Sequence, residues 1–143
     1  MSELLTKHDV LEAQSKWGSA VVAKDSDALL GLYDFSILLF KPTMAADIRT
    51  DADGALSYFI GGNSNYPGDQ GFLHNGFVGV NFESSRGPML GDGQTTAQDM
   101  GHYTFHKPDG SVVKADYSFC YRKVNGQTLI TLHHSSYNVG DNA

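Results

Sequence analysis

Residues 111–139 read SVVKADYSFCYRKVNGQTLITLHHSSYNV, and this stretch decides the fold. Asn125-Gly126 near its centre is a strong signal for a two-residue hairpin turn, because the favoured turn needs a positive φ at both positions. Before the turn, aromatic residues at 117, 119 and 121 alternate with smaller or polar ones, which is the period of a strand. The stretch therefore predicts two long antiparallel strands, residues 111–124 and 127–139.

The sheet extends toward the N-terminus from this hairpin. The segment Lys107-Pro108-Asp109-Gly110 is typical of a tight turn and links the hairpin to a predicted strand over residues 95–106. A Gly- and Pro-containing turn region at 86–93 separates that strand from another, predicted over residues 72–82.

The N-terminal half has a helical period instead. Thr6 can cap a helix whose apolar residues recur about every 3.6 positions until Lys24-Asp25-Ser26 interrupts the pattern. Shorter helices are predicted over residues 27–33 and, after the cap Thr50-Asp51, through Ile60, with a short apolar strand at 37–40 between them.

Helices followed by an antiparallel meander indicate the α+β class. We expect a single domain, residues 1–143, in which N-terminal helices pack on a strongly curved antiparallel sheet. The domain needs neither disulfides nor a structural metal to fold at this length.

The composition argues against several classes of function. Ten Lys and Arg residues against sixteen Asp and Glu give a net charge of −6, which disfavours a nucleic acid or an anionic membrane as the main partner. The segment Met1 to Lys7 lacks the features of a secretory signal, and no apolar run is long enough to span a bilayer. The single cysteine, Cys120, excludes an intramolecular disulfide and fits a reducing cytoplasm, while organelle import stays open.

The six histidines show no spacing that is typical of a metal site. His102 and His106 share a face of one predicted strand, but their Cα atoms lie about 13 Å apart at about 3.3 Å per residue. A zinc ion needs each ligand at about 2.0–2.1 Å. His133 and His134 point to opposite faces. A site assembled from distant histidines, such as His74, His102 and either His133 or His134, stays open, but the residues favour no metal.

The last strand begins apolar and ends polar. Strict alternation places Leu129, Thr131, His133 and Ser135 on one face, and Ile130, Leu132, His134 and Ser136 on the other. A polar end is typical either of a sheet that closes over an internal pocket or of a strand that reaches solvent. Elsewhere Cys120 is expected to be a packing residue, and Asp116 is the one acidic residue to test as a base in the cone.

Several C-terminal segments together resemble a known superfamily. They are Tyr103-Thr104-Phe105, Asp109-Gly110-Ser111, Phe119-Cys120-Tyr121-Arg122-Lys123-Val124 and His133-His134-Ser135-Ser136. These are similar to the association domain of calmodulin-dependent kinase II and its bacterial relatives. The resemblance implies the cone-shaped, cystatin-like α+β fold of SnoaL cyclases and ketosteroid isomerase, with an internal pocket.

The N-terminal half carries a narrower resemblance. Its segments are Leu39-Phe40-Lys41-Pro42-Thr43, Arg49-Thr50, Gly54-Ala55-Leu56-Ser57-Tyr58-Phe59-Ile60-Gly61 and Asp69-Gln70-Gly71-Phe72. They are similar to the iota class of carbonic anhydrases. This resemblance implies reversible hydration of carbon dioxide to bicarbonate, with no cofactor and no metal.

The resemblance also implies which residues carry the reaction. Thr43, Tyr58 and Ser135 would form a hydroxyl network that orients water and substrate, since a hydroxyl can both donate and accept a hydrogen bond. His133 is our candidate for the base that takes the water proton, and Ser136 is the alternative to Ser135. The apolar walls around carbon dioxide are expected to come from Phe40, Phe59, Phe72 and Phe77.

Two other functions remain open on the sequence. One is a non-catalytic association or small-ligand-binding module of the same fold. The other is an isomerase or cyclase, which normally needs a carboxylate base in the cone. Curved sheets of this type often pair through their outer face, so a homodimer is the expected oligomer.

Overall fold

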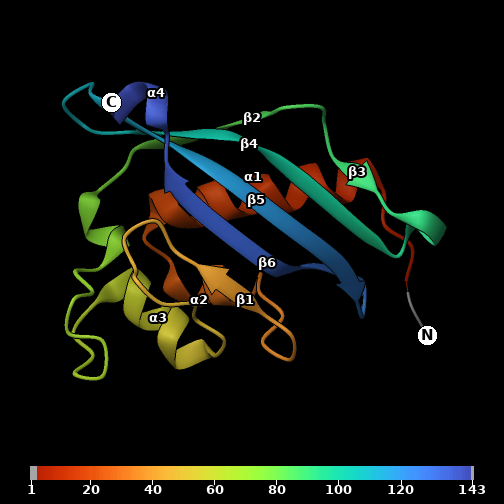
Figure 1. Ribbon diagram of the computed structural model, residues 1–143, viewed down its shortest axis with the longest axis horizontal. Helices are drawn as coiled ribbons and strands as arrows, with labels where there is room; N and C mark the ends of the chain where they lie inside the picture. The colour runs from red at the N-terminus through yellow and green to blue at the C-terminus, as the bar shows by residue number, and fades with distance from the viewer. Residues whose placement is uncertain (1–2, 143) are drawn as a thin grey trace.

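The computed structural model describes residues 3–142, and it is built as one long helix behind a curved sheet, with smaller elements closing one end (Figure 1). Met1 and Ser2, part of the segment expected to hold no secretory signal, lie outside these residues. No helix among residues 3–142 has both the length and the apolar character that a membrane span requires.

The helices begin at the caps that the sequence indicates. Helix α1 covers Lys7–Ala23, and Thr6 and Asp9 form a reciprocal capping box at its start. Helix α2 covers Ser26–Leu30, so it is shorter than predicted, and α3 covers Ala52–Ile60 with Asp51 as its cap. Helix α1 lies behind the sheet, and α3 lies at one end of it (Figure 1).

The sheet is mixed, which corrects the expectation of a purely antiparallel one. Its strand order is β1-β6-β5-β4-β2, and β1 runs parallel to β6 while the other neighbours are antiparallel. The strands cover Leu39–Lys41 (β1), Gly79–Ser84 (β2), Met89–Leu90 (β3), Thr96–His106 (β4), Val112–Val124 (β5) and Gln127–Tyr137 (β6). Strand β3 pairs with β4 inside the predicted turn region, and the short helix η2, Asp92–Gln94, follows it. The described residues end with the short helix α4, Val139–Asn142, whereas the sequence predicts that the last strand continues to Val139.

The segment predicted as a strand over residues 72–82 is two elements. Its first part is the 3₁₀ helix η1, Phe72–Asn75, and only its second part joins the sheet as β2. Gly71 and Gly76 flank η1 with φ values of 86° and 70°, a conformation that only glycine adopts readily. The two glycines therefore interrupt the strand pattern, and η1 places Phe72 beside α3.

Strand β6 contains a bulge that changes which side chains face the core. Cys120 pairs with Leu132 and Tyr121 pairs with Ile130, so Thr131 is an additional residue opposite β5. As a result Ile130, His133 and Ser135 are all buried, at 1%, 2% and 3% exposure. The predicted face of Leu129, Thr131, His133 and Ser135 is therefore wrong at its first two positions, because strict alternation ends at the bulge.

Candidate functional site

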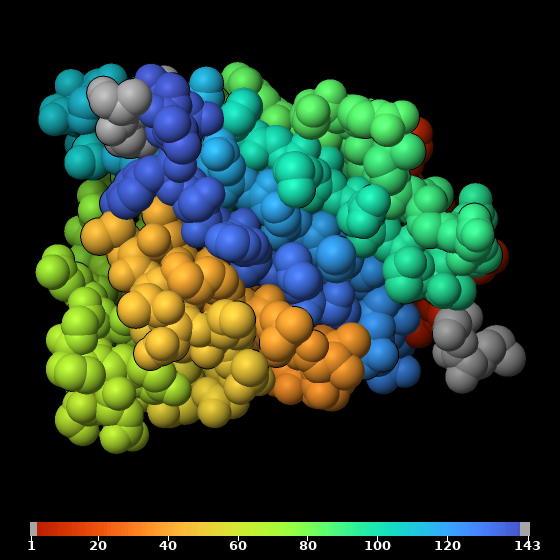
Figure 2. All heavy atoms as spheres, in the orientation of Figure 1, coloured from red at the N-terminus to blue at the C-terminus, as the bar shows by residue number. Residues whose placement is uncertain are grey.

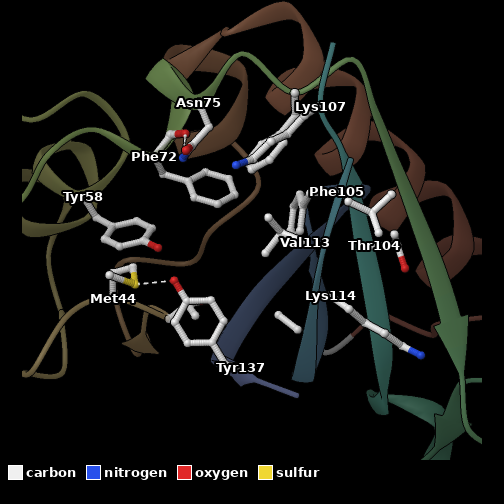
Figure 3. Close-up of a pocket in the computed structure, with 14 residues that line it drawn as sticks. Met44, Tyr58, Phe72, Asn75, Thr104, Phe105, Lys107, Val113, Lys114 and Tyr137 are labelled. Atoms are coloured by element: carbon white, nitrogen blue, oxygen red, sulfur yellow. Dashed lines mark hydrogen bonds between the residues drawn. The ribbon is translucent and has the colours of Figure 1, made fainter. Parts of the chain in front are cut away.

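A cavity of about 740 Å³ opens between η1, α3 and the ends of β4, β5 and β6 (Figure 3). Its polar lining includes Thr43, Tyr58 and Tyr137, and Figure 3 shows the two tyrosine hydroxyls facing the same space. Its charged lining, within the described residues, consists of Lys107 and Lys114, with no Asp or Glu. The cavity therefore offers hydrogen-bond donors and positive charge in a chain whose net charge is −6.

Thr43 and Ser135 meet at the wall of this cavity. Their hydroxyl oxygens lie 2.5 Å apart, although the residues are 92 positions apart in the chain. The parallel pairing of β1 with β6 explains the meeting. Phe40 pairs with His133 and Lys41 with His134, and the two chains then continue in the same direction to Thr43 and Ser135. Thr43 lines the cavity, and Ser135 lies behind it.

Tyr58 reaches the same point from α3. Burial raises the pKa of its hydroxyl to about 12, although hydrogen bonding with the Met44 backbone and the Thr43 hydroxyl lowers it in part. The hydroxyl therefore stays protonated at neutral pH and can donate a hydrogen bond into the cavity. The structure thus brings Thr43, Tyr58 and Ser135 together.

The structure gives Ser135 a second partner, Tyr103 of β4, which the sequence argument missed. The Tyr103 hydroxyl donates to Ser135 Oγ and also lies 3.1 Å from His133 Nε2. Burial raises the pKa of Tyr103 well above its ordinary value. The alternation of β4 places Tyr103 on the core face, but nothing in the sequence indicates which buried tyrosine meets Ser135.

His133 is enclosed, and both of its ring nitrogens are occupied. Nδ1 lies 3.0 Å from the Tyr33 hydroxyl, and the ring is stacked between Phe40 and Phe119 at centroid distances of 4.8 and 4.1 Å. Burial lowers the pKa of His133 to about 3, so the ring is neutral at neutral pH. His133 does not line the cavity. The hydroxyls of Tyr103, Ser135 and Thr43 lie between its ring and any water in the cavity.

The four predicted wall residues fall into two groups. Phe72 and Phe77 line the cavity. Phe40 and Phe59 are 1% exposed and lie deeper, where each packs against the Tyr58 ring at centroid distances of 6.0 and 5.7 Å. They support Tyr58 and do not form the wall themselves.

A buried ion pair holds the helix that carries Tyr58. Arg49 binds both carboxylate oxygens of Asp69 at 2.8 Å and donates to the Gly54 carbonyl, while the Ser57 hydroxyl donates to Asp69. The hydrogen bond from Arg49 lowers the pKa of Asp69. Arg49 and Asp69 belong to the segments of the resemblance, but the sequence alone does not predict that Arg49, which precedes α3, pairs with Asp69 in the loop that follows it.

Asp116 lies outside the cone. Its carboxylate is 2.7 Å from His102 Nδ1 on the outer face of the sheet, and both side chains are more than a third exposed. It is therefore not a base inside the cavity. The histidines are likewise dispersed: across residues 3–142, no three His, Cys, Asp or Glu side chains form a group that could hold a metal ion.

Asp99 is a buried carboxylate that sequence reasoning missed. It accepts hydrogen bonds from Gln14 of α1 at 2.7 Å, from Tyr117 at 2.9 Å and from the Ser84 hydroxyl. We call these four residues the carboxylate cluster. The cluster does not line the large cavity.

Comparisons with known proteins agree on one family. A family model described as metal-independent carbonic anhydrase matches residues 23–137. A metal-independent carbonic anhydrase from Nostoc sp. is 30% identical over 158 aligned positions, which cover 95% of this chain and 75% of the relative.

Solved structures show the same fold. A crystal structure of an iota-carbonic anhydrase from a cyanobacterium, complexed with bicarbonate, superposes with a TM-score of 0.86 at 27% identity, covering 96% of this chain and 95% of that one. A putative calcium/calmodulin-dependent kinase II association domain from Xanthomonas campestris superposes with a TM-score of 0.72 at 25% identity, covering 91% and 86%. The expected cone fold is confirmed, and the chain belongs to the metal-independent carbonic anhydrase family.

Proposed function

We propose that this member of the family hydrates carbon dioxide to bicarbonate at the cavity where Thr43, Tyr58 and Ser135 meet. The single observation that supports this most strongly is the 2.5 Å contact between the Thr43 and Ser135 hydroxyls at the cavity wall. The contact joins the end of the Leu39–Thr43 segment, which resembles the iota class, to the remote His-His-Ser-Ser segment, to which the resemblance assigns the serine of the site.

The reaction needs a water positioned against carbon dioxide and donors for the anion that forms. The water oxygen attacks the carbon, one carbon–oxygen double bond becomes a single bond, and a water proton leaves to solvent through the open cavity. Thr43 and Tyr58 donate hydrogen bonds to the bicarbonate oxygens. These two donors are in place before the negative charge develops, so they need no reorganisation. Phe72 and Phe77 provide the apolar wall that suits carbon dioxide.

His133 does not take the water proton in this mechanism. Both of its nitrogens are already bonded to tyrosine hydroxyls, and Thr43, Ser135 and Tyr103 stand between the ring and the cavity. Its role is to hold Tyr103 and, through Tyr103, Ser135. Lys107 lines the cavity and attracts the bicarbonate anion to a chain that is otherwise acidic, whereas the Lys114 side chain points away from the tyrosine hydroxyls (Figure 3).

A stopped-flow carbon dioxide hydration assay tests the function. The purified protein should accelerate hydration before and after chelation, with metal content measured on the same sample. Thr43→Val removes the hydroxyl with little change of shape and should lower kcat by about 100-fold, as removal of one preorganised donor does. Ser136→Ala, at an exposed position, is the matched control and should leave kcat unchanged.

Two other results would redirect the proposal. Activity that vanishes with the metal would overturn the metal-free mechanism and retain the reaction. A well-folded protein with no activity above buffer would favour the non-catalytic association module, since one solved structure of this fold is named a putative kinase association domain.

The proposal includes a homodimer in the cytoplasm. The outer face of the sheet, shown in Figure 2 with β6 and β5 in blue and β4 in teal, is open to solvent. It carries Met100 at 64% exposure and Leu39 at 50%. Pairing through this face would bury both side chains, and Met100→Lys should then convert the dimer to a monomer in light scattering after size-exclusion chromatography. A fluorescent fusion tests the compartment.

A further inference from the structure

An unbroken chain of hydrogen bonds runs through the core and ends at the cavity. We call it the hydroxyl chain, and its members, in order, are Trp17, Tyr33, His133, Tyr103, Ser135 and Thr43. The Trp17 indole nitrogen lies 3.0 Å from the Tyr33 hydroxyl. Apart from Thr43, every member is less than 5% exposed, so each hydrogen in the chain must be placed within the protein.

The Trp17 end has a fixed direction. An indole N–H can only donate, so the Tyr33 oxygen must accept from it. The hydrogen of Tyr33 then has one acceptor among the described residues, His133 Nδ1 at 3.0 Å. If His133 donated from Nδ1 instead, the Tyr33 hydrogen would be buried without a partner, which costs about 1–3 kcal/mol.

His133 passes this direction on. The ring is fully buried between two phenylalanines, and His134 further disfavours a charge on it, so it carries a single hydrogen. Because Nδ1 accepts from Tyr33, that hydrogen is on Nε2 and is donated to the Tyr103 oxygen at 3.1 Å.

The cavity end leads to the same direction independently. Tyr103 donates its hydrogen to Ser135, so its oxygen is available to accept from His133 Nε2. Ser135 accepts from Tyr103 and therefore donates to Thr43, at 2.5 Å. The hydrogen of Thr43 is then not used within the chain. It points either directly into the cavity or to the Tyr58 oxygen, and in the second case the Tyr58 hydrogen points into the cavity.

We infer that Trp17 and His133 are positioning residues that fix the direction of the hydroxyl chain, so that a hydroxyl at its cavity end has its hydrogen free to donate to a bound acceptor. The identity of the acceptor rests on the proposed function: it is an oxygen atom of bicarbonate or of carbon dioxide. In this direction the chain cannot take a proton from water, because every hydroxyl would first have to turn. It acts by orientation alone.

The tautomer of His133 tests this inference directly. Ring ¹⁵N chemical shifts of the full-length protein should show one neutral tautomer at pH 7, with hydrogen on Nε2 and none on Nδ1. Trp17→Phe removes the indole donor and frees the Tyr33 hydroxyl to turn. That variant should show both tautomers and a kcat about three- to tenfold lower, with KM unchanged.

Phe82→Leu is the matched control. Phe82 packs against Trp17 at a centroid distance of 5.9 Å but makes no hydrogen bond in the chain, so its variant loses similar packing and should keep the Nε2–H tautomer and the wild-type kcat. An Nδ1–H tautomer or an imidazolium in the wild-type protein would overturn the inference, whatever the stability of the variants. So would a Trp17→Phe protein with the wild-type tautomer and kcat.

The assay separates this inference from the proposed function. A wild-type protein with the Nε2–H tautomer and no hydration activity would confirm the direction of the chain and overturn the assignment of the acceptor. An active enzyme with the Nδ1–H tautomer would do the reverse.

Discussion

Two buried polar clusters line the concave face of the same sheet, and both begin on α1. Gln14 leads into the carboxylate cluster around Asp99, and Trp17 leads into the hydroxyl chain. In the first, the donors converge on one carboxylate and the hydrogen bonds end there. In the second, each group accepts from one neighbour and donates to the next until the cavity is reached.

The difference separates a structural cluster from a functional one. Buried carboxylate oxygens are stable only when donors surround them, so the carboxylate cluster must be closed. A neutral chain carries no such requirement and can end at a ligand. The buried ionisable group that a search for catalysis would select first, Asp99, is therefore the one that we expect to serve the fold.

The largest expected effect follows from Asp99→Asn. The amide would turn a donor toward groups that already donate, and we expect the free energy of unfolding in urea to fall by about 3 kcal/mol. The kcat of the folded protein should change by less than about twofold. Asp116→Asn, on the exposed outer face, is the control and should lower the free energy of unfolding by less than about 1 kcal/mol. A large loss of kcat in folded Asp99→Asn would break the distinction between the clusters.

The pH dependence of stability comes next. The pKa of His133 is about 3 in the folded protein and about 6.5 in the unfolded chain, so the unfolded chain binds more protons between these values. The contribution of His133 to the free energy of unfolding is therefore fully present above pH 6.5. It falls as the pH drops, and about 2 kcal/mol is lost at pH 5. Denaturation at several pH values measures this slope, and His133→Gln should remove it. A slope that persists in the variant would assign it to other groups.

A matched pair of substitutions compares the two clusters directly. Tyr117→Phe removes one donor from Asp99, and Tyr103→Phe removes one link from the hydroxyl chain, with the ring retained in both. Each should cost about 1 kcal/mol of stability. Only Tyr103→Phe should lower kcat, by about tenfold. Equal kcat values in the two variants would contradict the comparison.

The smallest effect is expected for Thr43→Ser, which keeps the hydroxyl and removes a methyl group. We expect kcat within about threefold of the wild-type value, against the large loss for Thr43→Val. A Thr43→Ser protein as inactive as Thr43→Val would show that the shape of the side chain matters more than its hydrogen.

The sequence predicts the local features of this fold well. Caps at Thr6 and Asp51 and the turn at Asn125-Gly126 act within a few residues, and all three lie at element boundaries in the structure. The parallel pairing of β1 with β6 was not predictable, because three residues of strand carry no signal for a partner about 90 positions away. The meeting of Thr43 with Ser135 depends on that pairing, so only the family resemblance indicated it.

The hydroxyl chain was missed for a related reason. Trp17, Tyr33 and Tyr103 all look like core aromatics in the sequence, and all three are core aromatics. What distinguishes them is where their single polar atoms meet, and that depends on the packing of α1 against β4 and β6. His133 was predicted to be the base that takes the water proton, but its inward orientation depends on the bulge in β6, which could not be read from the alternating pattern.

The bulge at Thr131 also has an evolutionary consequence. Without the bulge, strict alternation from Ile130 would turn His133 and Ser135 to the outer face of the sheet. Deletion of Thr131 would remove the bulge and its extra residue together, so His133 and Ser135 would still face the core. The site can therefore tolerate the loss of one codon here, whereas a change that straightens the strand at its full length would keep the sheet and lose the site.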